Sequence, residues 1–233
     1  MPSSKPRPAK PAPDVHKGKK KLLIVDDHPI VRERVAELIN QEADLVVCGE
    51  AEDANGALQA AKSLSPDMAI VDITLKDTYG IELIKQLKEL YPKLPILVLS
   101  MHEESMYGER ALRAGAKGYL TKQEASKKII DAIRRILRGE IYVSENLASV
   151  LVQKVAGGNA QAGGGSPVDA LTDRELEVFQ LLGAGLSVRD IAERLFVSTK
   201  TVEAHREHIK TKLRFKTSGE LLRFAIQYTL QEK

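Results

Sequence analysis

The chain has 233 residues, of which 43% are hydrophobic and 29% charged, the balance of a soluble globular protein with one or two domains. Aromatic residues make up only 4% and Trp is absent, which disfavours carbohydrate sites and base-stacking platforms. Cys48 is the single cysteine, which excludes an internal disulfide framework and a cysteine-rich zinc site. No signal peptide is visible and no apolar run approaches the ~18 residues of a membrane span, so we expect a cytoplasmic protein without a membrane partner.

The charge is spread unevenly along the chain. Residues 1–21 carry seven Lys/Arg and one Asp, or 7 − 1 = +6, and residues 166–233 carry 11 − 10 = +1, which leaves 3 − 6 − 1 = −4 for residues 22–165. Such shifts indicate separate modules. Residues 1–20 contain five prolines and no apolar periodicity, which predicts a disordered basic arm, either a solvated tail or a non-specific tether for nucleic acid.

A repeating strand–helix pattern follows and predicts an α/β domain over residues 21–144. Short apolar runs without alternation are typical of strands buried on both faces, and they occur at Leu22–Val25, Leu45–Cys48, Met68–Val71, Ile96–Leu99 and Gly118–Leu120. Helical patterns lie after them, at Pro29–Gln41, Ala54–Leu64, Ile81–Tyr91, Ser105–Ala114 and Ala125–Leu137. Five such units predict a doubly wound five-stranded parallel sheet with its first strand central.

The C-terminal part predicts a linker and a small all-α domain. Residues 145–167 combine a short helix at Glu145–Val155 with the flexible composition GGNAQAGGGSP. Four short helices are expected within residues 168–233, near 172–184, 188–195, 199–213 and 217–230. Thr172 with Glu175 has the spacing of a capping box, and Ser198 is a plausible N-cap for the third helix. The second and third helices, joined by a tight turn, indicate a helix-turn-helix.

Acidic and basic residues follow the predicted strands, where sites form in doubly wound sheets. Asp26 and Asp27 end the first strand, Asp72 the third, Ser100 the fourth and Lys122 the fifth. Crowded carboxylates repel one another unless a cation lies among them, and oxygen ligands suit Mg²⁺. A carboxylate beside Mg²⁺ can attack phosphorus and form an acyl phosphate. We therefore expect Asp72 to be the nucleophile, with the Asp pair holding the metal and Lys122 and Ser100 binding the phosphoryl group.

The third C-terminal helix has two faces that suit DNA binding. Val202, Ile209 and Leu213 are expected to face the core. The opposite face, expected to enter the major groove, carries Lys200, Glu203, Ala204 and Glu207. Basic residues that can reach phosphates are Arg206, Lys210, Lys212 and Arg214.

Residues 21–138 resemble the receiver domain of bacterial response regulators, a flavodoxin- and CheY-like fold. The matching motifs are LLIVDDHPIVRERV, IVDITLKDTYGIELI, ILVLSMH and GAKGYLTK. The resemblance implies that Asp72 is the phosphoacceptor, that Asp27 and Asp26 form the Mg²⁺-binding acidic pair, and that Lys122 binds phosphate. It further implies a metal-binding backbone carbonyl at Thr74, a switch pair in Ser100 and Tyr119 with the tyrosine turning inward on phosphorylation, and tuning of dephosphorylation by Thr74 and His102.

The stretch LTDRELEVFQLLGAGLSVRDIAERLFVSTKTVEAHREHIKTKL resembles the LuxR-type DNA-binding domain, and the whole chain resembles response regulators of the NarL/FixJ class. This implies signature positions at Thr201, His205 and Lys212, and approach to bases by Glu203, Ala204 and Glu207. The last helix would pair two DNA-binding domains, through a stripe made of Leu221, Leu222, Ala225 and Tyr228. Such a dimer would match an inverted-repeat site in double-stranded DNA.

The resulting hypothesis is a two-component transcription regulator. A sensor histidine kinase would phosphorylate Asp72, which would switch homodimerisation, domain arrangement and DNA binding, with RNA polymerase as a further partner. No enzymatic activity is expected beyond phosphoryl transfer to Asp72 and its autodephosphorylation. Three alternatives are weighed against it: a phosphorylation-independent LuxR-type regulator, an aspartate-nucleophile phosphatase and a ligand-sensing LuxR-type regulator. The first is the main rival, since the phosphatase needs Asp-x-Asp after the first strand and the ligand sensor needs an apolar pocket.

Overall fold

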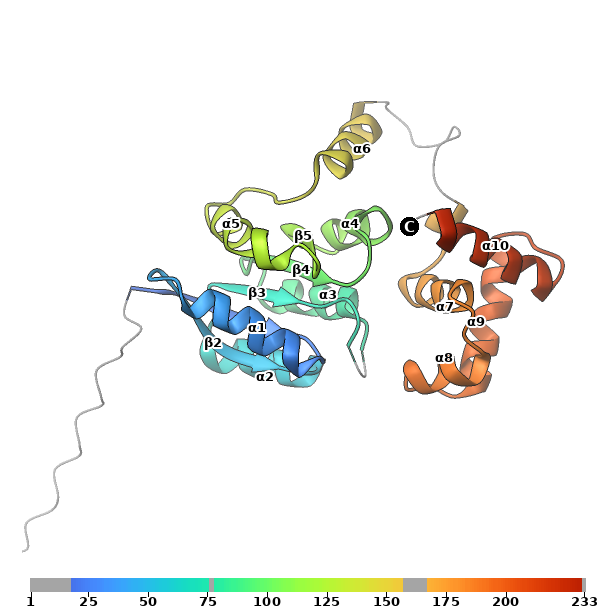
Figure 1. Ribbon diagram of the computed structural model, residues 1–233, viewed down its shortest axis with the longest axis horizontal. Coiled ribbons are helices and arrows are strands. Elements are labelled where there is room, and N and C mark those ends of the chain that lie inside the picture. The colour runs from blue at the N-terminus through green and yellow to red at the C-terminus, as the bar shows by residue number, and fades with distance from the viewer. Residues whose placement is uncertain (1–17, 76–77, 157–166, 232–233) are drawn as a thin grey trace, which may run out of the picture.

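The computed structural model describes residues 18–75, 78–156 and 167–231, which form a layered α/β body and a separate group of helices beside it (Figure 1). Most of the predicted basic arm and the Gly-rich part of the predicted linker, 157–166, lie outside the described residues. No helix in the described ranges is long and apolar enough to cross a membrane.

The sheet has five parallel strands, as the sequence predicts, and their order is β2-β1-β3-β4-β5. The strands are β1 (Lys20–Val25), β2 (Leu45–Ala51), β3 (Met68–Val71), β4 (Ile96–Ser100) and β5 (Gly118–Thr121). The expectation that the first strand is central is wrong by one place. Because β2 pairs with the outer side of β1, the chain returns across β1 and makes β3 the middle strand. Asp72, which follows β3, therefore stands at the centre of the sheet edge.

Helices cover both faces of the sheet because alternate strand residues are buried on opposite sides. One apolar cluster joins Leu22 and Ile24 of β1 to residues of α1 and α5, and a second joins Leu23 and Val25 to residues of α2, α3 and α4. These helices are α1 (Pro29–Asn40), α2 (Ala54–Leu64), α3 (Gly80–Leu90), α4 (Glu104–Arg113) and α5 (Ala125–Leu137). Their bounds agree with the predicted ranges to within one residue at each end.

Helix α6 (Glu145–Ala156) confirms the short helix expected in the linker, and its first turn is anchored to α4. The Ser144 N–H donates to Glu104 Oε1 at 3.0 Å. Leu147 is buried and approaches Gly108 so closely that a Cβ there would lie 2.5 Å from its methyl carbon. The start of the predicted linker is thus part of the α/β body.

The C-terminal helices form the predicted helix-turn-helix. A 3-10 turn, η1 (Pro167–Ala170), precedes α7 (Asp173–Gly183), α8 (Val188–Arg194), α9 (Thr199–Lys212) and α10 (Ser218–Gln231). Thr172 and Glu175 form the predicted capping box on α7, and the Ser198 hydroxyl accepts from the Thr201 N–H at the start of α9. Between α8 and α9 the chain turns through Phe196, whose positive φ of 52° makes the turn tight.

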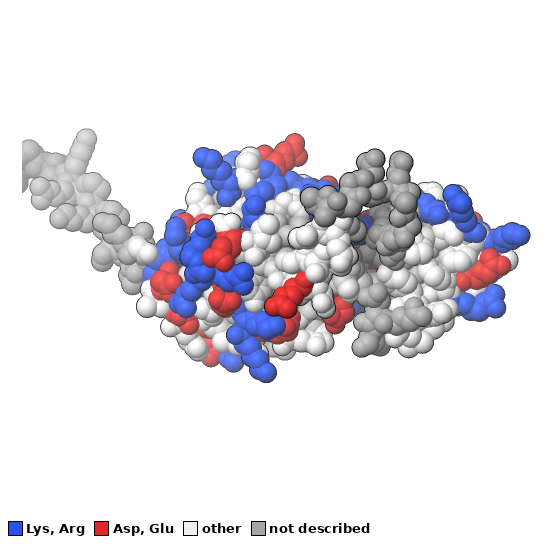
Figure 2. Space-filling model, turned by 90° about the horizontal axis from the view of Figure 1, so that it is seen from above, with Lys and Arg blue, Asp and Glu red and all other residues white. Residues whose placement is uncertain are grey.

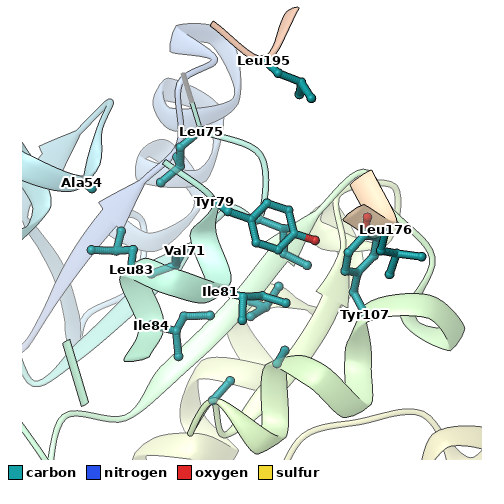
Figure 3. Packing of buried hydrophobic residues seen from close by; sticks show 14 of the residues in the cluster. Ala54, Val71, Leu75, Tyr79, Ile81, Leu83, Ile84, Tyr107, Leu176 and Leu195 are labelled. Atoms are coloured by element: carbon teal, nitrogen blue, oxygen red, sulfur yellow. The ribbon is translucent and has the colours of Figure 1, made fainter. Parts of the chain in front are cut away.

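The two bodies share one apolar core. Tyr79 and Tyr107 of the α/β body and Leu176 and Leu195 of the helical domain belong to the same buried cluster. Figure 3 shows the ring of Tyr107 beside Leu176, with the Tyr79 ring nearby. The helical domain is therefore packed directly onto the α3–α4 side of the α/β body.

Candidate functional site

The strand ends bring the predicted polar residues together around Lys122. Its Nζ lies 2.6 Å from Asp72 Oδ2 and 2.6 Å from Asp26 Oδ2. Asp26 and Asp72 are each only 2% exposed, and Ser100 is fully buried. β1, β3 and β5 thus supply one side chain each to a compact ion triad at the carboxyl edge of the sheet.

The triad perturbs the ionisation of its own members. Burial raises the pKa of Asp72 to about 6; the charge of Asp26 adds to this effect, while Lys122 opposes it. Burial works against the charge of Lys122, but Asp72 and Asp26 outweigh it and raise the pKa of the ammonium. Lys122 is thus held positive between two carboxylates, where it can also meet an incoming anion.

Beside the triad lies a set of groups that could hold a metal ion. Ligand atoms of Asp26, Asp27, His28 and Asp72 all lie within 4.8 Å of one another. The Oδ1 atom of Asp27 is buried, accepts no hydrogen bond within the described part of the chain, and faces His28 Nδ1 at 2.6 Å. Three clustered carboxylates fit a hard divalent cation such as Mg²⁺. Sequence reasoning missed His28; its only signal was its place directly after the Asp pair, and imidazole is a poor ligand for Mg²⁺.

The remaining predicted receiver residues form a hydrogen-bonded group at the mouth of the site. The Thr74 N–H donates to Asp72 Oδ1 at 3.3 Å, and Thr74 Oγ1 lies 3.1 Å from His102 Nε2. The His102 N–H donates to Ser100 Oγ at 3.2 Å. The Tyr119 hydroxyl donates to the His102 carbonyl at 2.8 Å, and Tyr119 is 2% exposed. Tyr119 is thus turned inward in this structure, and a turn driven by phosphorylation stays a prediction.

Helix α9 presents the face expected to meet DNA. Lys200, Thr201, Glu203, Ala204 and Glu207 are exposed, whereas His205, Arg206 and Lys210 are half-buried. Val202 and Ile209 are fully buried, as the helical spacing predicts. Acidic and basic side chains are mixed at the helical-domain end of the molecule in Figure 2, in keeping with the small net charge of this segment.

Two of the basic residues expected at DNA are held by carboxylates of the same domain. Lys212 Nζ lies 2.6 Å from Oε2 of Glu175, which is buried and also forms the capping box of α7. Lys210 Nζ lies 2.6 Å from Glu207 Oε2. Contact of either ammonium with a phosphate would therefore compete with an existing ion pair.

Two of the four residues expected at a dimer interface on α10 are instead buried within their own domain. Leu221 and Ala225 are 1% and 0% exposed because they pack against α7, where a Cβ on Gly183 would lie 2.5 Å from the Ala225 carbonyl oxygen. Tyr228 is half-buried against Phe179 and Phe224. The exposed apolar residues of this helix are Leu222, Ile226 and Leu230. The apolar surface of α10 that is free to contact a partner is therefore centred about one residue further along the helix than the predicted stripe.

Comparison with known proteins finds two family models on this chain. The model for the response regulator receiver domain matches residues 22–134, and the model for bacterial regulatory proteins of the luxR family matches residues 169–225. The chain is 35% identical over 215 residues to the oxygen regulatory protein NreC of Staphylococcus aureus, covering 91% of this chain and 99% of NreC. NreC of Staphylococcus epidermidis is 35% identical over 216 residues, with the same coverage.

Solved structures of related proteins resemble most of this chain. An RcsB response regulator of Salmonella typhimurium has a TM-score of 0.64 at 26% identity, over 90% of this chain and 98% of that one. RcsB of Salmonella enterica serovar Typhimurium, solved on the rprA promoter in the presence of the phosphomimetic BeF3−, has a TM-score of 0.60 at 28% identity, over 89% and 98%. A LuxR-family two-component response regulator from an Aurantimonas species matches 59% of this chain and 99% of its own, with a TM-score of 0.55 and 33% identity.

Proposed function

The chain belongs to the response regulators that join a receiver domain to a LuxR-type DNA-binding domain, and from this premise we propose that phosphorylation of Asp72 controls its binding to DNA. The donor we propose is a sensor histidine kinase. The observation that carries this proposal is the buried Asp72 carboxylate, which lies at the centre of the sheet edge and 2.6 Å from the Lys122 ammonium.

The proposed reaction is transfer of a phosphoryl group from a kinase phosphohistidine. A carboxylate oxygen of Asp72 attacks phosphorus, a P–O bond forms, and the P–N bond breaks with its electron pair returning to the imidazole nitrogen. Lys122 can neutralise the charge that gathers on the phosphoryl oxygens, and the Ser100 hydroxyl can donate to one of them. We propose Mg²⁺ as the metal held by Asp26, Asp27 and Asp72 with the Thr74 carbonyl; when bound, it supplies positive charge against the carboxylates and the phosphoryl oxygens.

We propose no turnover of other substrates. The only chemistry assigned is phosphoryl gain at Asp72 and hydrolysis of the same acyl phosphate. Thr74 and His102 border Asp72 through the hydrogen bonds described above, which supports a role for them in tuning the lifetime of the phosphoryl group.

The proposed output is sequence-specific binding of double-stranded DNA by a dimer. The exposed face of α9 with Lys200, Glu203, Ala204 and Glu207 would lie in the major groove, and Glu can accept a hydrogen bond from cytosine N4. Solved structures place RcsB on promoter DNA, which supports the same partner here. An inverted repeat would match a two-fold dimer, and RNA polymerase is the further partner we propose. A regulator of chromosomal DNA would act in the cytoplasm of a bacterium.

The test is phosphorylation with a small donor. The protein is incubated with Mg²⁺ and acetyl phosphate, and intact mass and light scattering are followed together. We expect a phosphoryl adduct, a shift toward the dimer, and loss of both in Asp72→Asn. The matched control is Asp131→Asn, an exposed carboxylate on α5, which should behave as the parent protein. Absence of an adduct in the parent protein would favour the phosphorylation-independent regulator instead.

A further inference from the structure

An apolar groove lies at the amino edge of the sheet, opposite the carboxylates. It is formed by the turn from α2 to β3 and the turn from α3 to β4, and its volume is about 520 Å³, within the roughly 300–1,000 Å³ of ligand pockets. Ala61 and Leu94 are buried in it, Tyr91 and Pro95 are half-buried, and Pro92 is exposed. The described part of the chain therefore leaves this groove open to a further apolar segment.

The composition of the groove is typical of surfaces that bind proline-rich segments. Such segments adopt the polyproline II conformation with little loss of entropy and dock on aromatic side chains. Tyr91 supplies an aromatic ring, and three prolines supply rigid apolar walls, namely Pro66, Pro92 and Pro95. Lys93 adds an exposed positive charge. The occupant that fits this chemistry is a proline-rich segment that carries a carboxylate.

A segment of this kind precedes β1 in the same chain. Residues 11–15 read Pro-Ala-Pro-Asp-Val, and Asp14 is the only acidic residue among the first 21. Within this segment there is one Asp and no Lys or Arg, so its charge is −1 although residues 1–21 together are strongly basic. Residues 11–15 therefore fit the groove and Lys93 better than the Lys- and Arg-containing residues before them.

The start of β1 is tied to a residue that lines the groove, Asp67. Lys20 Nζ lies 3.0 Å from Asp67 Oδ1, and the Lys21 N–H donates to Asp67 Oδ2 at 2.8 Å. The Lys21 ammonium also donates to the Leu64 carbonyl at the end of α2, at 2.7 Å. Gly18 has a φ of 104°, which glycine adopts without strain, so the chain can change direction just before β1. The chain thus enters the sheet directly beside the groove.

The segment is close enough in sequence to reach the groove. Residues 16–19 separate it from β1, and an extended chain covers about 3.3 Å per residue, so these four residues span up to roughly 13 Å. The groove begins at Asp67, which Lys20 contacts directly. A tether this short gives the segment a high effective concentration at the groove, so even weak binding would be populated.

We propose that residues 11–15 dock in this groove of their own chain, with the prolines against Tyr91 and Asp14 beside Lys93. The arm that the sequence predicts to be a solvated tail or a tether for nucleic acid is then divided in two. Its part nearest β1 is held on the receiver domain, and its more basic part, residues 1–10, extends beyond the groove. This docking goes beyond the proposed function and does not depend on phosphorylation of Asp72.

Disulfide trapping in the full-length chain tests the docking. In a Cys48→Ser background, which removes the single native cysteine, Ala12→Cys is combined with Ser65→Cys in the groove. Disulfide formation under mild oxidation is followed by intact mass after alkylation of the remaining thiols. Because a disulfide needs Cα atoms within about 7 Å, a docked segment favours this pair.

The matched control places the second cysteine at the same edge of the sheet but outside the groove. Ala43→Cys is exposed and lies next to Glu42, whose carbonyl accepts from Lys19 Nζ at 3.2 Å, so an undocked arm would reach it as readily. We expect the disulfide to form at least about tenfold faster at position 65 than at position 43, a ratio that corresponds to about 1.4 kcal/mol.

Two further variants test the source of this preference. Pro11→Gly combined with Pro13→Gly alters the segment and leaves every groove residue in place, and the preference should fall to about twofold or less because the preformed conformation is lost. Tyr91→Ala removes the aromatic ring and should have the same effect, with circular dichroism as the check that this variant folds.

Each other outcome contradicts a stated part of the proposal. Equal trapping at positions 65 and 43 would show a solvated tail and overturn the docking. A preference that survives both the Pro→Gly changes and Tyr91→Ala would overturn the groove as its cause. Disulfide-linked dimers in place of crosslinks within one chain would assign the segment to a second copy and overturn docking within its own chain.

Discussion

Asp72 is a carboxylate whose surroundings disfavour its charge. It is 2% exposed and shares Lys122 with Asp26, so one ammonium faces two carboxylates. Burial raises its pKa to about 6, from 3.8. Since the folded protein binds the proton more tightly than the unfolded chain, ionised Asp72 lowers stability progressively between pH 3.8 and about 6, and the full cost is present above that range.

This gives a stability prediction for Asp72→Asn. In metal-free buffer at pH 8 the amide should raise the free energy of unfolding by about 2 kcal/mol, because a pKa difference of roughly two units corresponds to about 3 kcal/mol at most. The gain should shrink at pH 5, where Asp72 is largely protonated. Urea unfolding at the two pH values measures both.

Asp67→Asn is the contrasting control. Burial opposes the charge of Asp67, but the Lys21 N–H and the Lys20 ammonium outweigh it and lower the pKa of Asp67. That carboxylate therefore stabilises the fold fully at pH values above its ordinary pKa of 3.8, and its loss should cost the same stability at pH 8 as at pH 5. If Asp72→Asn instead gave the same gain at both pH values, ionisation of Asp72 would not be its source.

At the scale of elements, α10 shows how packing decides which face of an amphipathic helix is free. Gly183 allows α7 to approach the backbone of Ala225, and this close approach buries Leu221 and Ala225 inside the domain. Leu222, Ile226 and Leu230 are left exposed, by 38%, 38% and 67%. This second stripe has the spacing of one helix face, so it is the surface we expect between two protomers.

Ile226→Lys should therefore prevent dimerisation without unfolding the domain. A charge buried in an apolar interface costs several kcal/mol, enough to weaken the dimer more than 100-fold. Light scattering in the presence of the phosphomimetic BeF3− and Mg²⁺ measures this against the exposed neighbour Gln227→Lys, which should still dimerise. A dimer that survives Ile226→Lys would move the interface away from α10.

At the scale of the whole molecule, the two domains are held by one core and a small number of charged contacts. Tyr107 and Leu176 are buried in the same cluster (Figure 3). Arg110 spans from α4 to the start of α7. The arrangement therefore depends on surfaces that face each other only after each domain has folded.

Arg110→Ala should open the unphosphorylated protein. Hydrogen bonds from a charged group contribute about 1.5 to 3 kcal/mol each, so losing this guanidinium should shift the balance between docked and undocked domains at least tenfold. Small-angle scattering should show a larger radius of gyration, by on the order of 2 Å over the docked form. Arg113→Ala, whose side chain is 76% exposed on the same helix, is the matched control and should leave the radius unchanged.

The sequence alone predicts most of the secondary structure and the members of the site, because both depend on patterns among residues close together in the sequence. Apolar runs buried on both faces predict the five strands, and side chains with helical spacing and capping residues such as Thr172 predict the helices. The carboxyl ends of parallel strands meet at one edge, so Asp26, Asp72 and Lys122 could be grouped from their positions after the strands.

Only the tertiary structure decides which residues each strand, helix and side chain contacts. It makes β3 the middle strand, adds His28 to the carboxylates, and commits Lys212 to Glu175. It buries Leu221 rather than Leu222, and it brings Tyr107 to Gln180 across 73 positions of sequence. Periodicity and spacing report which residues share a face, but not what that face meets, because the facing surface is supplied by a distant part of the chain.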